Sequence, residues 1–173
     1  PGQCNMYNNA SYRQFNVSGT TSFSFSAAAA TVRIKPAISA WTGSTSVGVD
    51  PAPGTDGIGT IDYKVTNPSA GVWHYEYAVY NQSLARAIQS FAVPVGCGVT
   101  VSNMGFHAPP QEPGWANDGT AGSAGFSSTP WTPVQSAGNL TWTTETLAQN
   151  ATANAIRWGT LYNFRFYSHQ PPT

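Results

Sequence analysis

The sequence predicts an all-β fold, an antiparallel β-sandwich of jelly-roll or immunoglobulin-like type with about nine short strands. Runs of β-branched and aromatic residues alternate with polar residues at a period of two, and Gly, Pro, Asn and Ser separate these runs. Helix-forming stretches are nearly absent, since the best one, residues 83–89 (SLARAIQ), amounts to one or two turns. A closed barrel is the alternative arrangement for the same strands.

The strand signals before residue 58 come in short runs. Residues 1–20 are rich in Asn, so we expect an irregular segment. Residues 21–26 (TSFSFS) alternate with both phenylalanines on one face, and residues 31–35 (TVRIK) alternate with Val and Ile facing inward. Residues 38–41 favour a short strand, and residues 43–57 favour a turn-rich connection.

Residues 72–81 (VWHYEYAVYN) give the strongest strand signal. Trp73, Tyr75 and Tyr77 share one face of this strand, whereas Tyr80 lies on the other, so we expect both faces of its sheet to be covered. A strand at 58–66 and a tight turn at 67–71 precede it, which predicts an antiparallel hairpin. The remaining strands are expected at 90–94, 99–106, 139–144 and 161–167.

A long loop is predicted at 107–133, at ~27 residues much longer than ordinary connections. Its aromatic residues Trp115, Phe126 and Trp131 have three interpretations: they cover an open sheet face, they contact another subunit, or they stack on a sugar. His107 opens the loop, and together with Trp115 and Trp131 it forms the candidate ligand-binding set.

The composition excludes some partners. Only 8% of the residues are charged and the formal net charge is zero, which argues against nucleic acid because phosphates require clustered Lys and Arg. Zero net charge also removes the repulsion that keeps molecules apart, so it favours association into a homo-oligomer or polymer. No apolar run approaches the ~20 residues of a membrane span.

Two cysteines could form a disulfide in an oxidising compartment, whereas several of the five glycosylation sequons are expected by chance in a chain this rich in Asn, Ser and Thr. A Cys4–Cys97 disulfide would tie the N-terminal segment to the body; two free thiols or a bridge between subunits are the alternatives. The chain begins at Pro1 without a methionine, as expected for a processed product. The sequons, which matter only in a eukaryotic secretory pathway, are at Asn9, Asn16, Asn81, Asn139 and Asn150.

Candidate catalytic residues are few, and the expectation is that the chain is not an enzyme. His74 and Glu76 project from one face of the same strand, where they form either an acid–base pair or part of a polar, solvated face. A glycosidase would need two carboxylates at close range, for which Glu76 with Glu145 or Asp118 is the pair to test. No metal site or cofactor is predicted.

The domain prediction is a single β-sandwich over residues 1–173, with residues 1–36 as an N-terminal segment. Such a segment can add a strand to its own sandwich or to that of a neighbour. Strand addition that runs head to tail without closing produces a polymer.

Several motifs carry a resemblance to a known family. The block VWHYEYAVYN, followed by QSFAVP, GVTVSNMGFH, LTWTTETLAQN and NAIRWGTLYNFRF, resembles a family of secreted bacterial proteins of uncharacterised function over approximately residues 34–171. The resemblance implies a secreted or cell-surface location and a β-sandwich fold, and it supplies no catalytic residues. We also expect Arg157 to pair with Glu76 or Glu145, or to stack, just before the last strand.

Three functions follow as hypotheses. The first is an extracellular structural protein, a self-assembling subunit of a filament, tube or surface layer. The second is a module that binds a polysaccharide or another surface ligand through exposed Trp side chains. The third is a glycoside-active enzyme.

Overall fold

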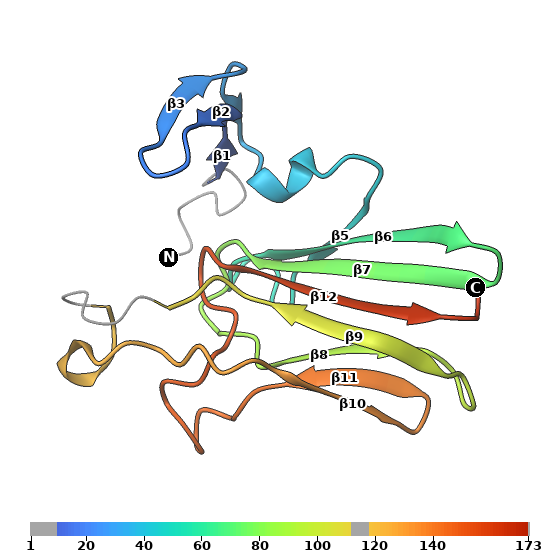
Figure 1. Ribbon diagram of the computed structural model, residues 1–173. Helices are drawn as coiled ribbons and strands as arrows, with labels where there is room; N and C mark the ends of the chain where they lie inside the picture. The colour runs from blue at the N-terminus through green and yellow to red at the C-terminus, as the bar shows by residue number, and fades with distance from the viewer. Residues whose placement is uncertain (1–9, 112–117, 173) are drawn as a thin grey trace.

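The computed structural model describes residues 10–111 and 118–172. The chain folds as antiparallel β-sheets, with a five-stranded sheet stacked on a three-stranded one and an N-terminal segment standing apart (Figure 1). This confirms the predicted all-β, sandwich-like fold class. The described residues form twelve strands: β1 (Ser11–Tyr12), β2 (Phe15–Ser18), β3 (Ser24–Ala27), β4 (Val32–Arg33), β5 (Thr45–Val49), β6 (Gly59–Ser69), β7 (Val72–Asn81), β8 (Ser90–Pro94), β9 (Val101–His107), β10 (Thr132–Ser136), β11 (Asn139–Thr143) and β12 (Leu161–Ser168).

The large sheet has the strand order β5-β6-β7-β12-β9, and the small sheet has the order β10-β11-β8. Neighbouring strands are antiparallel throughout both sheets. The β6–β7 hairpin turns at Gly71, whose positive φ of 70° suits a residue without a Cβ. The two-residue turn between β10 and β11 uses Ala137 and Gly138, both with positive φ, as a type I′ hairpin requires.

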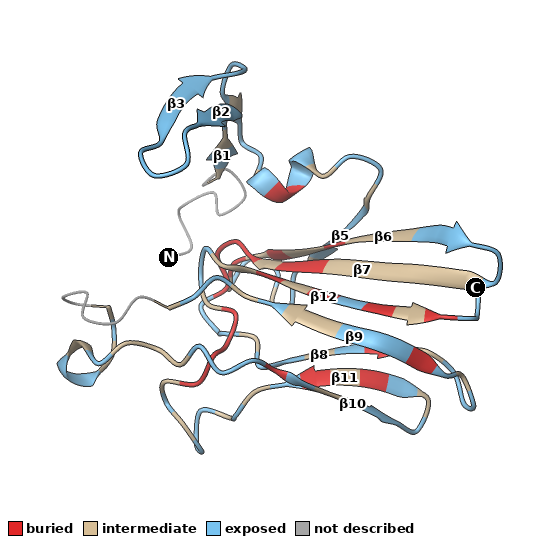
Figure 2. Ribbon diagram, viewed as in Figure 1, coloured by how far each residue is buried: buried red, intermediate tan, exposed pale blue. Residues whose placement is uncertain are grey.

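The core lies between the two sheets and is mostly aromatic (Figure 2). Phe164 of β12 is fully buried at its centre, and the rings of Phe91, Trp131 and Trp142 all lie within 5.4 Å of its own, centroid to centroid. Offset and tilted ring pairs of this kind add stability beyond the area that they bury. Of the residues predicted to share one face of the strand at 72–81, Tyr75 and Tyr77 pack on this core together with Val79.

The N-terminal segment forms two small sheets of its own, β1 with β4 and β2 with β3. Its hydrogen bonds join residues of the segment to one another, for example Arg13 Nε to the Ala29 carbonyl. A short 3-10 helix, η2 (Ala37–Ala40), then leads to β5. Figure 1 shows the segment beyond the β5–β6 end of the large sheet and away from β8, β10 and β11.

The structure corrects several predicted elements. Strand β2 lies in the segment predicted to be irregular, and β5 lies in the predicted turn-rich connection 43–57. Residues 38–41 belong to a 3-10 helix and its cap rather than a strand, because Pro36 precedes a tight turn closed by the Ser39 and Trp41 N–H groups. The inward placement of Ile34 is also wrong, since this residue is exposed and has a positive φ of 61°.

Two further predictions concern helices. Residues 83–89 form bends and an isolated bridge at Ile88 rather than the turn or two of helix that their composition allows. In the described part of the chain, no helix is both long and apolar enough to cross a membrane.

Candidate binding groove

The two sheets are offset, so part of the large sheet's inner face is open. Phe91 of β8 packs over Tyr77 of β7 and over β12, which places β8 above β7. The small sheet ends at β8, whereas the large sheet continues with β6 and β5. The inner faces of β6 and β5 therefore lack a covering strand from the small sheet.

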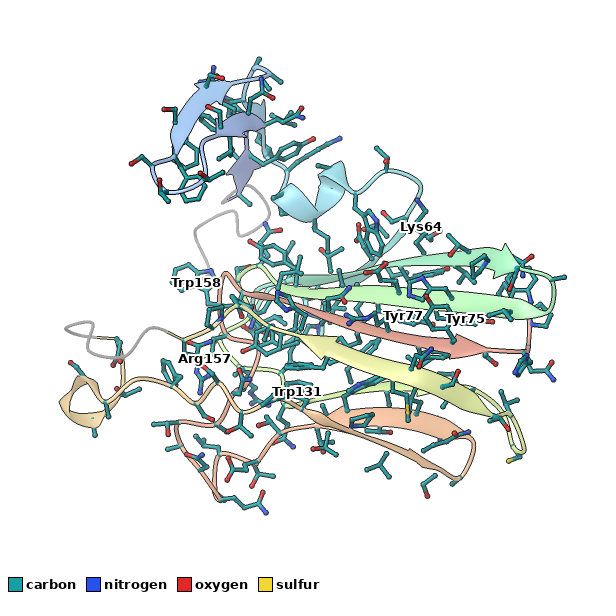
Figure 3. The ribbon with its side chains drawn as sticks, viewed as in Figure 1. Lys64, Tyr75, Tyr77, Trp131, Arg157 and Trp158 are labelled. Carbon is teal, nitrogen blue, oxygen red and sulfur yellow. The ribbon has the colours of Figure 1, made fainter. Side chains whose placement is uncertain are left out.

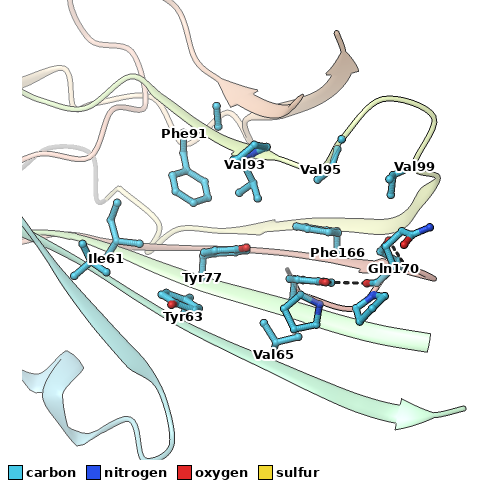
Figure 4. Close-up of a pocket in the computed structure, with 18 residues that line it drawn as sticks. Ile61, Tyr63, Val65, Tyr77, Phe91, Val93, Val95, Val99, Phe166 and Gln170 are labelled. Atoms are coloured by element: carbon cyan, nitrogen blue, oxygen red, sulfur yellow. Dashed lines mark hydrogen bonds between the residues drawn. The ribbon is translucent and has the colours of Figure 1, made fainter. Parts of the chain in front are cut away.

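An open groove of about 780 Å³ lies at this step between the sheets (Figure 4). Its floor is formed by β6 and β7, one wall by β8, and one end by the C-terminal residues 170–172. The aromatic and aliphatic residues that dominate its lining are Val47, Ile61, Tyr63, Val65, Tyr75, Tyr77, Phe91, Val93, Val95, Val99 and Phe166. Among the described residues, none that line the groove is charged, which suits an uncharged, apolar ligand or partner.

Three tyrosines, Ser168 and Gln170 bring polar groups to the groove lining, and Figure 3 labels two of them, Tyr75 and Tyr77. The Tyr75 hydroxyl donates a hydrogen bond of 2.8 Å to the Gln170 carbonyl and so fixes the C-terminal residues at the groove's end. Burial, with smaller contributions from the neighbouring Tyr75 and Tyr63, raises the pKa of Tyr77 to about 12. Tyr77 therefore presents a neutral phenol in the groove at physiological pH.

The wall of the groove is a free strand edge. Directly before and after β8, the Gln89 carbonyl accepts from the Thr144 N–H and the Val95 N–H donates to the Gly138 carbonyl, so the odd-numbered positions between them also face β11. Because backbone direction alternates along an antiparallel strand, the N–H and C=O groups of Ser90 and Ala92 point toward the groove. Such an edge can pair with a further strand.

The outer face of the large sheet is polar and has a structural role. Glu76 stands opposite Lys64 on one side and Arg165 on the other, and unlike charges in register stabilise neighbouring strands. His74 shares this face, as predicted, and its ring stacks on Tyr167 with centroids 4.6 Å apart. On this face Glu76 Oε1 accepts a hydrogen bond from the Asn163 amide, while the buried Nε2 of His74 has no hydrogen-bond partner among the described residues.

The predicted carboxylate pair is not assembled. Glu76 accepts a hydrogen bond from Asn163 on the outer face of the large sheet, whereas Glu145 follows β11 of the small sheet and accepts one from Asn150. Asp118 stabilises a turn, because its carboxylate accepts bonds from both the N–H and the hydroxyl of Thr120. The same hydrogen bonds lower the pKa of Asp118.

The predicted ligand-binding residues separate in the structure. Trp131 is 2% exposed and stacks on Phe106 in the core, so its candidacy as a ligand-binding residue is wrong (Figure 3). Its indole N–H donates to the Asn154 carbonyl, which shows why a buried Trp is tolerated there. His107 is exposed at the end of β9, and Trp115 lies outside the described residues.

Arg157 anchors the long loop rather than pairing with Glu76 or Glu145. Its guanidinium lies 3.5 Å from the centroid of the Phe126 ring and donates hydrogen bonds to the carbonyls of Ala153 and Ala155. Burial lowers the pKa of Arg157, although the group stays protonated at any ordinary pH. The ring that Arg157 stacks on is Phe126, in the loop predicted at 107–133, a partner that was not predicted from the sequence.

The sequons differ in accessibility. Asn81 is 0% exposed. Its side-chain NH₂ donates to the carbonyls of Leu84, Arg86 and Ile156, and its side-chain oxygen accepts from the Leu84 N–H, so this amide is not accessible in the folded chain. Asn16 and Asn139 are exposed, Asn150 is half-buried, and Asn9 lies outside the described residues.

Cys97 has an exposed, free thiol in the structure, next to the β10–β11 turn at Gly138. Cys4, its predicted partner, lies outside the described residues. The structure thus lends no support to the predicted Cys4–Cys97 bridge. Among the described residues, no group of three or more His, Cys, Asp or Glu is arranged to hold a metal ion.

The sequence did not indicate the groove. In the sequence, the residues that line the groove resemble ordinary core residues, because Tyr63, Tyr77 and Phe91 alternate with polar residues in the same way as fully buried side chains do. The alternation of Phe15 and Val17 was a usable signal for β2, but the Asn-rich surroundings hid it.

Comparison with known proteins adds no constraint. A scan against protein-family models, a search of curated proteins and a search of solved structures each found no match. The groove, the free β8 edge and the N-terminal segment are therefore interpreted from their own chemistry.

Proposed function

We propose that this protein is an extracellular structural protein that assembles with copies of itself into a filament, tube or surface layer. The observation that carries the proposal is the β2–β3 hairpin. Phe15 pairs with Ala27 and Val17 with Phe25, which places these apolar side chains on one face of the hairpin. Phe23 and Phe25 are 59% and 66% exposed.

An exposed apolar face on a two-stranded hairpin is unstable by itself. Isolated hairpins are at best marginally stable in water, and contiguous exposed apolar patches usually mark interaction sites. The opposite face of the hairpin carries Asn16, Ser24 and Ser26, so the hairpin is amphipathic in the way of a strand pair that covers a core. Such a hairpin gains stability when another molecule covers its apolar face.

Low charge density supports self-association as the form of this contact. The chain has 7 Lys and Arg and 7 Asp and Glu in 173 residues, so copies do not repel one another. The extracellular location remains part of the proposal and depends on the resemblance described above. Electron microscopy of the purified full-length chain tests the proposal, since filaments, tubes or sheets are expected and dispersed single particles would overturn it.

Polysaccharide binding remains a second candidate because of one observation. Trp158 is 72% exposed beside the loop that Arg157 anchors (Figure 3), and a flat exposed indole can stack on a sugar ring. A pull-down with insoluble cellulose and chitin tests this function. Retention that the Trp158→Ala substitution abolishes would favour it over self-assembly.

A further inference from the structure

The groove and the hairpin match in width. The small sheet has three strands and the large sheet has five, so the uncovered face is two strands wide. The β2–β3 hairpin is two strands wide and presents one apolar face. A hairpin placed beside β8 would extend the small sheet to five strands and cover the inner faces of β6 and β5.

The two surfaces also match in chemistry. The groove lining contains no charged side chain among the described residues, and the hairpin sequence from Phe15 to Ala27 (FNVSGTTSFSFSA) contains none either. Docking therefore buries no charged side chain of the groove lining or of residues 15–27, and the Arg13 guanidinium, whose carbon lies 5.6 Å from the Phe15 ring centroid, has to stay in contact with water at the rim of the interface. The unpaired N–H and C=O groups of Ser90 and Ala92 supply a ladder for the hairpin's edge.

We propose that the β2–β3 hairpin of one copy docks in the groove of a second copy, beside β8, and that repetition of this contact builds the polymer. The inference rests on the proposed self-assembly and names the contact that produces it. Because the donor and acceptor surfaces are different, the contact is head to tail, and such contacts form open filaments unless the rotation closes a ring.

The position of the hairpin favours a second copy over its own groove. The connection to β5 is held on the outer face of the large sheet, where Lys64 Nζ donates to the Thr42 carbonyl and Ser44 donates to Asp62. The groove lies on the inner face of the same sheet. To enter its own groove, the hairpin would have to pass around the β5 edge, whereas the groove of a neighbour is open to it.

The contact has a size consistent with a specific interface. The exposed side chains of Phe15, Val17, Phe23 and Phe25 offer roughly 100 Å² each, so the apolar face offers roughly 400 Å² and the two partners together about 800 Å². The hairpin backbone along β8 adds to this and brings the contact toward the ~1,200 Å² at which specific interfaces begin. Every internal copy makes the contact twice, once as donor and once as acceptor.

Two full-length variants each alter one of the two surfaces that form the contact, the groove or the hairpin. Val47→Glu places a carboxylate in the groove, and Phe23→Ser with Phe25→Ser removes the apolar face of the hairpin. Val134→Glu is the matched control for the groove, because Val134 is 56% exposed on edge strand β10 while Val47 is 48% exposed on edge strand β5. Leu147→Ser is the control for loss of exposed apolar surface, because Leu147 is 78% exposed.

Sedimentation velocity measures the protein concentration at which each variant assembles. We expect the concentration at half-assembly to rise at least about tenfold for the groove variant and for the hairpin variant, because an unpaired charge or a lost anchor weakens docking strongly. The two control variants should assemble as the unaltered chain does. An equimolar mixture of the groove and hairpin variants should form one-to-one dimers, since one keeps a donor and the other keeps an acceptor.

Several outcomes would overturn the inference. If the unaltered chain assembles and either variant assembles equally well, the contact lies elsewhere and the proposed self-assembly survives. If the equimolar mixture of the groove and hairpin variants stays monomeric, the contact likewise lies elsewhere. If the unaltered chain never assembles, the proposed function fails as well. Circular dichroism verifies that each variant is folded. Ala92→Pro is an independent test, because it removes an N–H group from the free edge of β8, which already contains Pro94, and should therefore also prevent the hairpin from docking.

Discussion

Phe91 and Tyr77 form the border between the closed part of the sandwich and its groove. Their ring centroids lie 5.4 Å apart, with Phe91 on the last strand of the small sheet and Tyr77 on the strand below it. Beyond this pair the large sheet continues and the small one does not. The pair therefore sets the step that creates the groove.

Loss of the Phe91 ring should destabilise the sandwich. This ring also packs 4.7 Å from Phe164, so Phe91→Ala removes contacts in both sheets. We expect a loss of about 2–3 kcal/mol, below the value for a fully buried ring because Phe91 is half-buried. Urea unfolding monitored by Trp fluorescence measures it, and an unchanged midpoint would contradict the proposed packing.

Trp131 and Trp158 should behave in opposite ways. Trp131→Ala empties a core position beside Phe106, for which we expect a loss of about 3–5 kcal/mol. Trp158→Ala removes an exposed ring and should change stability by less than about 0.5 kcal/mol. Equal effects in thermal or urea unfolding would show that Trp131 does not belong to the core.

Asn81 should act as a structural amide and not as a glycan acceptor. Asn81→Ala leaves the buried Leu84 N–H without its acceptor, so we expect a loss of about 2–3 kcal/mol. Asn139→Ala is the matched control, because its exposed side chain bonds only within its own turn among the described residues. Mass spectrometry after secretion from a eukaryotic host should find Asn81 unmodified, and a glycan there would contradict its burial.

Alkaline pH should weaken the fold through Tyr77. Its folded pKa is raised to about 12 from an unfolded value near 10, so its contribution to stability is complete below pH 10 and is lost as the pH rises toward 12. With partial exposure taken into account, the loss is at most about 2 kcal/mol. Unfolding measured at pH 9 and pH 11 should show this decline, and Tyr77→Phe should reduce it.

Much of the fold was predictable from local pattern. The long strands β7 and β12 carry alternating aromatic residues over eight or more positions, and their predicted bounds agree with the structure to within a residue. Strands β5 and β10 were missed because their signals are weak: β5 is the five-residue run TSVGV with a glycine, and β10 contains Pro133. Both are edge strands, where proline and small residues are tolerated.

The groove was not predictable in this way. It results from an offset between two sheets, which depends on the pairing of β8 with β11 and on the stacking of Phe91 over Tyr77. Alternation states which face of a strand is apolar, but not whether another strand covers that face. For the same reason, the sequence placed Trp131 among ligand-binding candidates although its ring completes the core.

Sedimentation velocity of the unaltered chain over a hundredfold concentration range tests the central claim of self-assembly most directly. The exposed hairpin and the open groove predict that the average mass rises continuously with concentration, through dimers to larger species. A single boundary with the mass of one chain at every concentration would contradict the claim.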